Sequence, residues 1–297
     1  MNSGNPTTYT VYFQIAGISV EVTSDLPVTP STFGKKFESF RVETPGADLV
    51  KIHHHFSPPD VTKYQLNDEV YRKAPWVIFK EDGKWIYGEV LPGKDRLNRM
   101  AVFSEDHASC DMYHDSITKR NYVAGNLASL TLFPTDQIIF SKILPERQGC
   151  YIHSAGLIID GKGYVFVGHS DAGKSTLTNL LRKDAEILCD DRNIIRKQGQ
   201  KFLVHGTWSH GDIEDVSSAC AEIQGIMFIH QADTNRIVPV ESRQEAMKRI
   251  LPCLIKPFVT ADWWYHVLDL VEDIVKQVPC YDLYFDKSGK IVDWLIG

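Results

Sequence analysis

The residues with the clearest chemistry form one short run, Gly168–Ser175, which reads GHSDAGKS. The run fits G-x-x-x-x-G-K-[ST], a pattern in which backbone N–H groups curl around phosphate oxygens. In such a loop the lysine, Lys174, reaches the β- and γ-phosphates of a nucleotide, and the hydroxyl of Ser175 binds Mg²⁺. The candidates for nucleotide binding are the loop and the residue after it: Gly168, His169, Ser170, Asp171, Ala172, Gly173, Lys174, Ser175 and Thr176.

The elements on either side of this run support the phosphate interpretation. The apolar residues 164–167 predict a strand that leads in, and residues 175–183 predict a helix that leads out. The start of a helix adds partial positive charge where a phosphate would lie. An ordinary strand, turn and helix with a stray lysine is the alternative, and the agreement of spacing, flanks and Ser175 argues against it.

A pair of acids provides the second chemical feature. Asp190 and Asp191 end the apolar run 187–189, only sixteen positions after Lys174. A short helix followed by a strand would return both carboxylates to the phosphate loop. One could hold Mg²⁺, and the other could accept a proton from an attacking hydroxyl. A solvated turn after a buried strand is the alternative, which the short distance from Lys174 disfavours.

These segments, together with IHSAG at residues 152–156, resemble the catalytic domain of HPr kinase/phosphorylase. That domain is related in fold to the nucleotide site of phosphoenolpyruvate carboxykinase. The family places a histidine before the loop strand, matched by His153, and two aspartates after the loop helix, matched by Asp190 and Asp191. Its E-I-R-G-I-G segment resembles EIQGIM at residues 222–227. The resemblance covers roughly residues 137–297.

The resemblance implies a Mg²⁺-requiring kinase that uses ATP, or GTP, and transfers the γ-phosphate to a hydroxyl. The acceptor would be a serine of a protein or peptide, or a small molecule. Lys174 would stabilise charge on the transferring group, while Asp190 would be the general base with His153 assisting. Ser175, Asp191 and Glu222 would hold Mg²⁺. The roles of the two aspartates could be exchanged.

Several departures from the family keep other functions open. Asp171 stands where the family usually has glycine, Gln224 replaces the family arginine, and no signature for phosphorolysis is present. The chain therefore resembles the wider group of HPr-kinase-like proteins, and the reverse reaction is not assumed. An NTP hydrolase and a nucleotide-binding adaptor without turnover remain alternatives. Purely structural interpretations of two residues also remain open: His153 as a partly buried histidine, and Glu222 as a surface acid.

The chain as a whole predicts an α/β protein of two domains. Residues 1–135 are β-rich, with a strand pair turning near Gly17 and a hairpin at Asp82-Gly83. We expect this smaller domain to recognise the acceptor. Residues 136–297 would form the HPr-kinase-like P-loop domain, a mixed sheet with flanking helices. Its first helix, residues 137–144, would be capped by Thr135 or Asp136.

Composition excludes some partners and locations. The 297 residues carry a formal net charge of −6 and contain no basic run, which argues against nucleic-acid binding. No apolar stretch is long enough to cross a bilayer, and residues 1–10 do not resemble a signal peptide. We therefore expect a cytoplasmic protein without a membrane partner, whose six dispersed cysteines stay reduced. By analogy with the family, it would form a homo-oligomer.

Two further segments attract functional interpretations. The loop at residues 205–212, HGTWSHGD, is rich in small residues and is expected near substrate or nucleotide; a tryptophan anchoring a surface turn is the alternative. The three consecutive histidines, His53–His55, invite a metal assignment. Consecutive side chains on a strand alternate between its faces, so the three cannot all converge on one ion, and we predict no metal site there.

Overall fold

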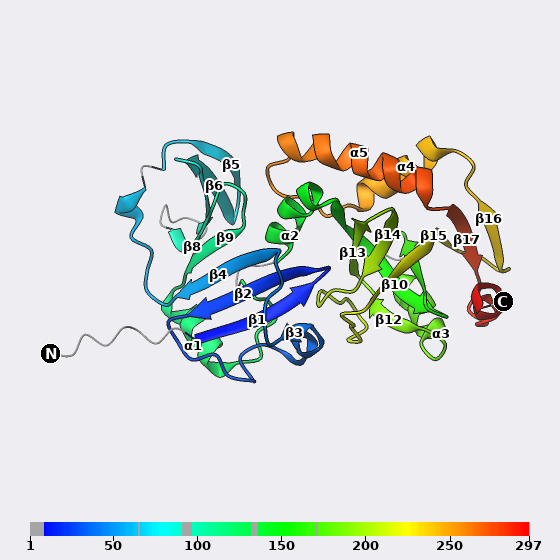
Figure 1. Ribbon diagram of the computed structural model, residues 1–297, viewed down its shortest axis with the longest axis horizontal. Coiled ribbons are helices and arrows are strands. Elements are labelled where there is room, and N and C mark those ends of the chain that lie inside the picture. The colour runs from blue at the N-terminus through cyan, green and yellow to red at the C-terminus, as the bar shows by residue number, and fades with distance from the viewer. Residues whose placement is uncertain (1–8, 65, 91–96, 132–135, 170–171, 297) are drawn as a thin grey trace. The chain divides into compact units, whose positions relative to one another are not determined.

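The structure is a computed structural model that describes residues 9–64, 66–90, 97–131, 136–169 and 172–296 (Figure 1). The chain divides after Ile139, within α2 (Gln137–Ile143), into two compact units. Each unit is built around one sheet that mixes parallel and antiparallel strand pairs, and helices are few. The fold is therefore α/β, as the sequence predicts.

Among the described residues of the first unit, nine strands form a sheet in the order β3-β1-β2-β4-β9-β8-β7-β6-β5. The strands are β1 (Tyr9–Ile15), β2 (Ile18–Ser24), β3 (Arg41–Val42), β4 (Leu49–His55), β5 (Glu69–Lys73), β6 (Trp76–Glu81), β7 (Lys84–Val90), β8 (Leu97–Phe103) and β9 (Ser109–Tyr113). Over the described part of this unit, one α-helix, α1 (Ser116–Ala124), and two 3₁₀ turns, Lys35–Phe40 and Val61–Lys63, accompany the strands.

Both predicted hairpins of this unit are confirmed. Strands β1 and β2 pair antiparallel around Ala16 and Gly17, and β6 and β7 pair around Asp82 and Gly83. All four turn residues have positive φ, which is why glycine occupies the second position of each turn. Strand β4 lies between β2 and β9 and runs parallel to both.

The second unit is built around an eight-stranded sheet, counted over the described residues, with the path β11-β10-β13-β14-β15-β17-β16. Strand β12 pairs with β10, and β11 also pairs with β15. The strands are β10 (Gly149–Ile159), β11 (Lys162–Val167), β12 (Glu186–Cys189), β13 (Arg192–Gln198), β14 (Lys201–His205), β15 (Cys220–Gln231), β16 (Arg236–Pro239) and β17 (Cys280–Phe285). The α-helices are α2 (Gln137–Ile143), α3 (Lys174–Leu181), α4 (Arg243–Ile250), α5 (Ala261–Gln277) and α6 (Ile291–Ile296), and the 3₁₀ turns are Pro145–Arg147 and Leu251–Cys253.

Both faces of this sheet are buried. Along β15, Ile226 and Phe228 join one core cluster, whereas Met227 and Ile229 join the other. The first cluster is covered by α4 and α5, and the second by α3 and α6; Figure 1 shows α4 and α5 on the side of the sheet away from α3. Burial on both faces explains why β11 and the middle of β15 read as continuous apolar runs.

Helix α4 ends at Ile250 and is followed by a 3₁₀ turn that contains Pro252, because proline cannot donate the next helical hydrogen bond. The Asp136 carboxylate accepts the backbone N–H groups of Leu130 and Thr131, and its role as the cap of α2 stays a prediction. Thr135 lies outside the described residues.

None of the described helices combines the length and apolarity needed to cross a membrane. All six cysteines are described, and they are free thiols.

Candidate functional site

The glycine-rich loop follows β11, whose neighbours are β10 and the parallel strand β15. A Cβ atom on Gly168 would lie 2.7 Å from Cβ of Ala172 and 2.8 Å from Cγ1 of Ile229, so only glycine fits there. Gly173 has φ of 101°, a conformation that glycine adopts without strain, and α3 begins at the next residue. These two glycines allow the tight turn from strand to helix. Ser170 and Asp171 lie outside the described residues.

Lys174 is directed back over the loop. Its Nζ donates to the carbonyl oxygens of Gly168 at 3.0 Å and His169 at 3.3 Å, and the residue is only 8% exposed. The backbone N–H of Ala172 also donates to the His169 carbonyl, at 3.1 Å. The ammonium group therefore lies against the curled backbone, where it can add its charge to that of the backbone N–H groups.

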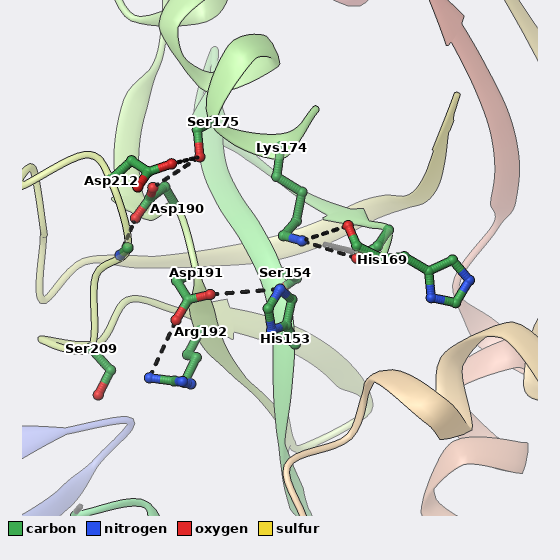
Figure 2. Close-up of polar contacts among 12 residues, drawn as sticks. His153, Ser154, His169, Lys174, Ser175, Asp190, Asp191, Arg192, Ser209 and Asp212 are labelled. Carbon is green, nitrogen blue, oxygen red and sulfur yellow. Dashed lines mark hydrogen bonds and ion pairs between the residues drawn. The ribbon is translucent and has the colours of Figure 1, made fainter. Parts of the chain in front are cut away.

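Ser175 faces two carboxylates. Its Oγ lies 3.4 Å from Oδ2 of Asp190 and 3.3 Å from Oδ2 of Asp212 (Figure 2). The hydroxyl stands in the first turn of α3, and Asp190 directly follows β12. Three oxygen-bearing side chains from three segments thus meet at the start of the helix.

Asp190 is the more deeply held of the two neighbouring acids, with an exposure of 2%. Its carboxylate accepts the backbone N–H of Gly211 at 2.7 Å and that of Ile213 at 3.0 Å. Two charge-assisted bonds from the backbone offset the cost of burying the charge and fix its direction. The loop after β14 therefore positions the first aspartate.

Asp191 points to a different set of partners. Its Oδ1 lies 3.6 Å from Nε2 of His153, and its Oδ2 lies 3.2 Å from a guanidinium nitrogen of Arg192 (Figure 2). Burial, together with the charge of Lys174, holds the pKa of His153 below its ordinary value, although Asp191 opposes this shift. The histidine is therefore mainly neutral at pH 7, and the Asp191 carboxylate is paired chiefly with Arg192.

A buried asparagine holds the two strands that carry these groups together. Nδ2 of Asn193 donates to the carbonyl of Ser154 at 2.7 Å and to that of Cys189 at 3.1 Å. Gly156 lies against the Asn193 side chain. A Cβ atom at position 156 would be only 2.4 Å from that side chain, so glycine leaves room for the asparagine. The bridge fixes the chain just after His153 to the chain just before the two aspartates.

These side chains share one cavity of about 440 Å³. It is lined by His153, Gly173, Lys174, Ser175, Thr176, Asp190, Asp191, Gly211, Asp212 and Gln231. The structure thus brings together the predicted residues His153, Lys174, Ser175, Thr176, Asp190 and Asp191.

Glu222 is not brought to this group. It stands near the start of β15, where the neighbouring residue Ile223 pairs with Gly163 at the start of β11. The loop leaves the other end of β11, where Val167 pairs with Phe228. Glu222 instead forms an ion pair with Lys201 at 2.5 Å. In the described structure Glu222 is a surface acid at the opposite end of the sheet from the loop, which agrees with the alternative interpretation of this residue.

The loop at residues 205–212 holds a buried tryptophan and also reaches the cavity, and its place near substrate or nucleotide stays a prediction. Trp208 is 1% exposed and packs edge-on against Phe140, so it anchors the loop. Gly211 and Asp212, at the far end, line the cavity. The sequence offered a signal for Asp212, the acid at the end of this loop, whereas Arg192 and Gln231 carried none. Gln231 reaches the cavity only because β15 runs parallel to β11.

Comparison with known families adds a classification. The family model of SynChlorMet cassette protein ScmC matches residues 124–295, more than half of the chain. The chain belongs to the ScmC family. The residues that match the ScmC model include every residue that lines the cavity. Most of the first unit lies outside the match.

No curated protein matches the sequence significantly. Among solved structures, the Hpr(Ser) kinase/phosphatase from Coxiella burnetii is similar to this ScmC-family chain at 10% sequence identity. The match covers 48% of this chain and 90% of that chain, with a TM-score of 0.28. The resemblance is distant and supports no functional conclusion.

Proposed function

We propose that the chain is a Mg²⁺-dependent phosphotransferase that moves the γ-phosphate of ATP, or of GTP, to a hydroxyl group. The observation that carries the proposal is the shared cavity, in which Lys174, Ser175 and both aspartates meet at a glycine-rich turn. An HPr-kinase-like arrangement of the second unit is part of the same proposal. Its support is the position of His153 and the two aspartates around the loop.

In this proposal the loop backbone and Lys174 bind the phosphates. The ammonium group now lies on the carbonyls of Gly168 and His169, which are weaker partners than a phosphate oxygen. A rotation of the side chain would exchange these contacts for the β- and γ-phosphates. Lys174 would then stabilise the negative charge of the transferring group in a site that is already organised.

The oxygen donors fit Mg²⁺, which prefers carboxylate and hydroxyl ligands. Ser175, Asp190 and Asp212 would hold it, since the Ser175 hydroxyl lies against both carboxylates. Mg²⁺, when bound, neutralises charge on the β- and γ-phosphate oxygens. Asp190 therefore takes the metal role that the sequence assigned to Asp191, and Glu222 takes no part.

Asp191 is then the proton acceptor. It lines the cavity, and its carboxylate is held between Arg192 and His153. A hydroxyl that enters the cavity beside it could give its proton to the carboxylate as its oxygen bonds to the γ-phosphorus, while the bond from that phosphorus to the β–γ bridging oxygen breaks and the nucleoside diphosphate leaves. Arg192 fixes the direction of the carboxylate, and His153, largely neutral, can share the proton. In this proposal the two aspartates exchange the roles first given to them from sequence: Asp191 is the base and Asp190 the metal ligand.

The acceptor is defined here only as a hydroxyl. Preference for serine rests on the family resemblance, and acceptor recognition by the first unit remains a prediction. The alternatives, an NTP hydrolase and a nucleotide-binding adaptor, would use the same cavity. They differ from a kinase in the fate of the γ-phosphate, which makes that fate the decisive measurement.

The experiment supplies the purified chain with γ-labelled ATP or GTP, Mg²⁺ and an extract fractionated by size. A kinase transfers label to a protein, peptide or small molecule, and omission of Mg²⁺ abolishes the transfer. Release of label only as inorganic phosphate, in every fraction, would replace the kinase proposal with the hydrolase. Nucleotide binding without turnover would replace it with the adaptor.

A further inference from the structure

A second group of metal-binding side chains lies on the sheet of the first unit, outside the proposed kinase site. Strand β4 pairs with β2 and β9, and its residues alternate between the two faces of the sheet. His54 points inward and is fully buried, whereas His53 and His55 share the other, more exposed face. Asp25 follows β2 directly, where its backbone N–H donates to the His54 carbonyl.

The alternation that the sequence predicts is therefore confirmed, and the three histidines do not converge. Alternation also places residues two apart side by side, so it does not by itself argue against a metal site built on two of the three histidines. His53 and His55 have ring centroids 4.2 Å apart. With Asp25 they form the histidine–aspartate cluster, in which one potential ligand atom from each residue lies within 4.8 Å of the others.

The distances within this cluster suit a small ion. Nε2 of His53 lies 3.0 Å from Oδ1 of Asp25, and Nδ1 of His55 lies 3.4 Å from Oδ2 of the same carboxylate. Ligands that bind a tetrahedral ion at 2.0–2.1 Å are separated from one another by about 3.3 Å. Each nitrogen faces a different oxygen of the carboxylate at close to that spacing, and the ligand atoms of the three residues lie within 4.8 Å of one another, so rotation of the side chains could bring them onto one ion.

The outer nitrogen of each imidazole also has a partner. Nδ1 of His53 lies 2.6 Å from the hydroxyl of Thr23, and Nε2 of His55 lies 3.1 Å from the carboxylate of Asp111. The ring of Tyr113 stacks on His55 with centroids 4.8 Å apart. Partners of this kind orient the rings of metal-bound histidines and fix which nitrogen carries the proton. They would leave Nε2 of His53 and Nδ1 of His55 directed at the shared carboxylate.

The cluster is open to solvent. The side chains of His53 and His55 are 26% and 28% exposed, and that of Asp25 is 46% exposed. An ion can therefore reach the site without unfolding the sheet. Three protein ligands would leave a fourth position for water or for a ligand from outside. Two imidazoles and one carboxylate favour Zn²⁺ and similar transition metals over Mg²⁺ or Ca²⁺.

We propose that Asp25, His53 and His55 bind one divalent transition-metal ion, Zn²⁺ in the first instance, with Thr23 and Asp111 orienting the imidazoles. The site belongs to the first unit and does not depend on the proposed kinase function. An ion-paired histidine–aspartate network that binds no metal is the competing interpretation.

The test is a calorimetric titration of tag-free, metal-stripped full-length protein with Zn²⁺ in the absence of nucleotide. We expect one equivalent to bind to the parent chain. Loss of a ligand weakens binding at least as much as loss of an outer partner, so Asp25→Asn and the double variant His53→Ala/His55→Ala should bind about 100-fold more weakly. Asp25→Asn keeps the shape of the side chain, so it remains informative if the double variant fails to fold.

His266→Ala is the matched control, because His266 is an exposed histidine on α5 outside the cluster. It should bind Zn²⁺ as the parent does. Titration with Co²⁺ adds a spectroscopic check: nitrogen and oxygen ligands give visible bands without thiolate charge transfer. Absence of Zn²⁺ binding by the parent, unchanged affinity in Asp25→Asn, or a thiolate band would each overturn the proposal.

Discussion

The two candidate sites are built in opposite ways. The cavity of the second unit forms around a continuous turn in which main-chain geometry matters most, and Gly168, Gly173 and Lys174 lie within seven residues. The histidine–aspartate cluster of the first unit has no such turn. Its ligands come from β4 and from the residue after β2, and Asp111 of β9 adds the outer partner.

This difference shows why one site can be recognised in the sequence and the other cannot. A phosphate loop binds through consecutive backbone N–H groups, so its requirement is written in consecutive residues. The cluster depends on which strands are neighbours and in which register. In the register of the sheet, His53 of β4 pairs with Thr23 of β2 on one side and with Asp111 of β9 on the other. The three residues are nevertheless far apart along the chain.

The largest expected effect comes from removing the ammonium group of the loop. Lys174→Ala should lower kcat/KM for phosphoryl transfer about 10³-fold, because a preorganised charge that faces the transferring phosphate is lost. The measurement is transfer from γ-labelled nucleotide. Zn²⁺ binding by the same variant should be unchanged, which would separate the two sites experimentally.

Lys183→Ala is the matched control for this variant, since Lys183 is an exposed lysine just beyond α3. Its activity should equal that of the parent. If Lys174→Ala retained both nucleotide affinity and turnover, the residues 168–175 would not be the phosphate-binding loop. The proposed site of the second unit would then be wrong.

The two aspartates should separate by the kind of loss they cause. Asp191→Asn should lower kcat by about 10²–10⁴-fold at saturating Mg²⁺, the usual contribution of a general base. Asp190→Asn should chiefly raise the Mg²⁺ concentration needed for half-maximal activity, because it removes a carboxylate beside the Ser175 hydroxyl. The measurement is kcat as a function of Mg²⁺.

Asp184→Asn, which changes an exposed acid between α3 and β12, should match the parent in both quantities. The reverse pattern, with a metal defect in Asp191→Asn and a pure rate defect in Asp190→Asn, would restore the assignment first drawn from sequence. Equal activity in all three variants would exclude both assignments.

Much of the cavity was predictable from sequence because it is local. The loop, the helix after it and the aspartate pair lie within one strand–helix–strand unit, so their convergence needs no knowledge of the remaining fold. Placing Asp212 and Gln231 in the cavity requires knowledge of which elements are neighbours in the fold. Asp212 arrives from the loop after β14, and Gln231 from the end of a strand parallel to β11, and neither neighbour relation can be derived from composition.

The error at Glu222 has the same physical origin. A short segment resembling a known motif gives the identity of a residue but not the end of the strand on which it lies. The long strand β15 carries Glu222 near one end and Gln231 at the other, and only the second end meets the glycine-rich loop. Sequence also predicted both hairpins of the first unit, because their turns are local, but not the order of its strands.

Both units contain buried histidines, His54 in the first and His205 in the second. His205 of β14 is 4% exposed, and its Nε2 has no hydrogen-bond partner among the described residues. Burial and then the charge of Arg196 lower its pKa to about 4. An unfolded chain would protonate this histidine near pH 6.5, so stability is unaffected above that pH and is lost as the pH falls from 6.5 towards 4.

His205→Phe should therefore lose less stability in acid than the parent. Between pH 7 and pH 5, this one group contributes a loss of about 2 kcal/mol to the parent and none to the variant. Urea denaturation followed by circular dichroism at both pH values measures the difference. Equal losses in the two proteins would show that His205 is protonated in the folded state without cost.

The smallest expected effect comes from removing the hydrogen bond that orients His53 in the histidine–aspartate cluster. Thr23→Val keeps the shape of the side chain but removes the hydroxyl that lies 2.6 Å from Nδ1 of His53. Loss of one outer partner should weaken Zn²⁺ binding about tenfold, with the stoichiometry unchanged. Thr10→Val is the matched control, because Thr10 pairs with Thr23 across β1 and β2 but makes no described contact with the histidines. Equal affinity in both variants would mean that the hydroxyl does not orient His53, and the cluster would then resemble a surface ion pair more than a supported site.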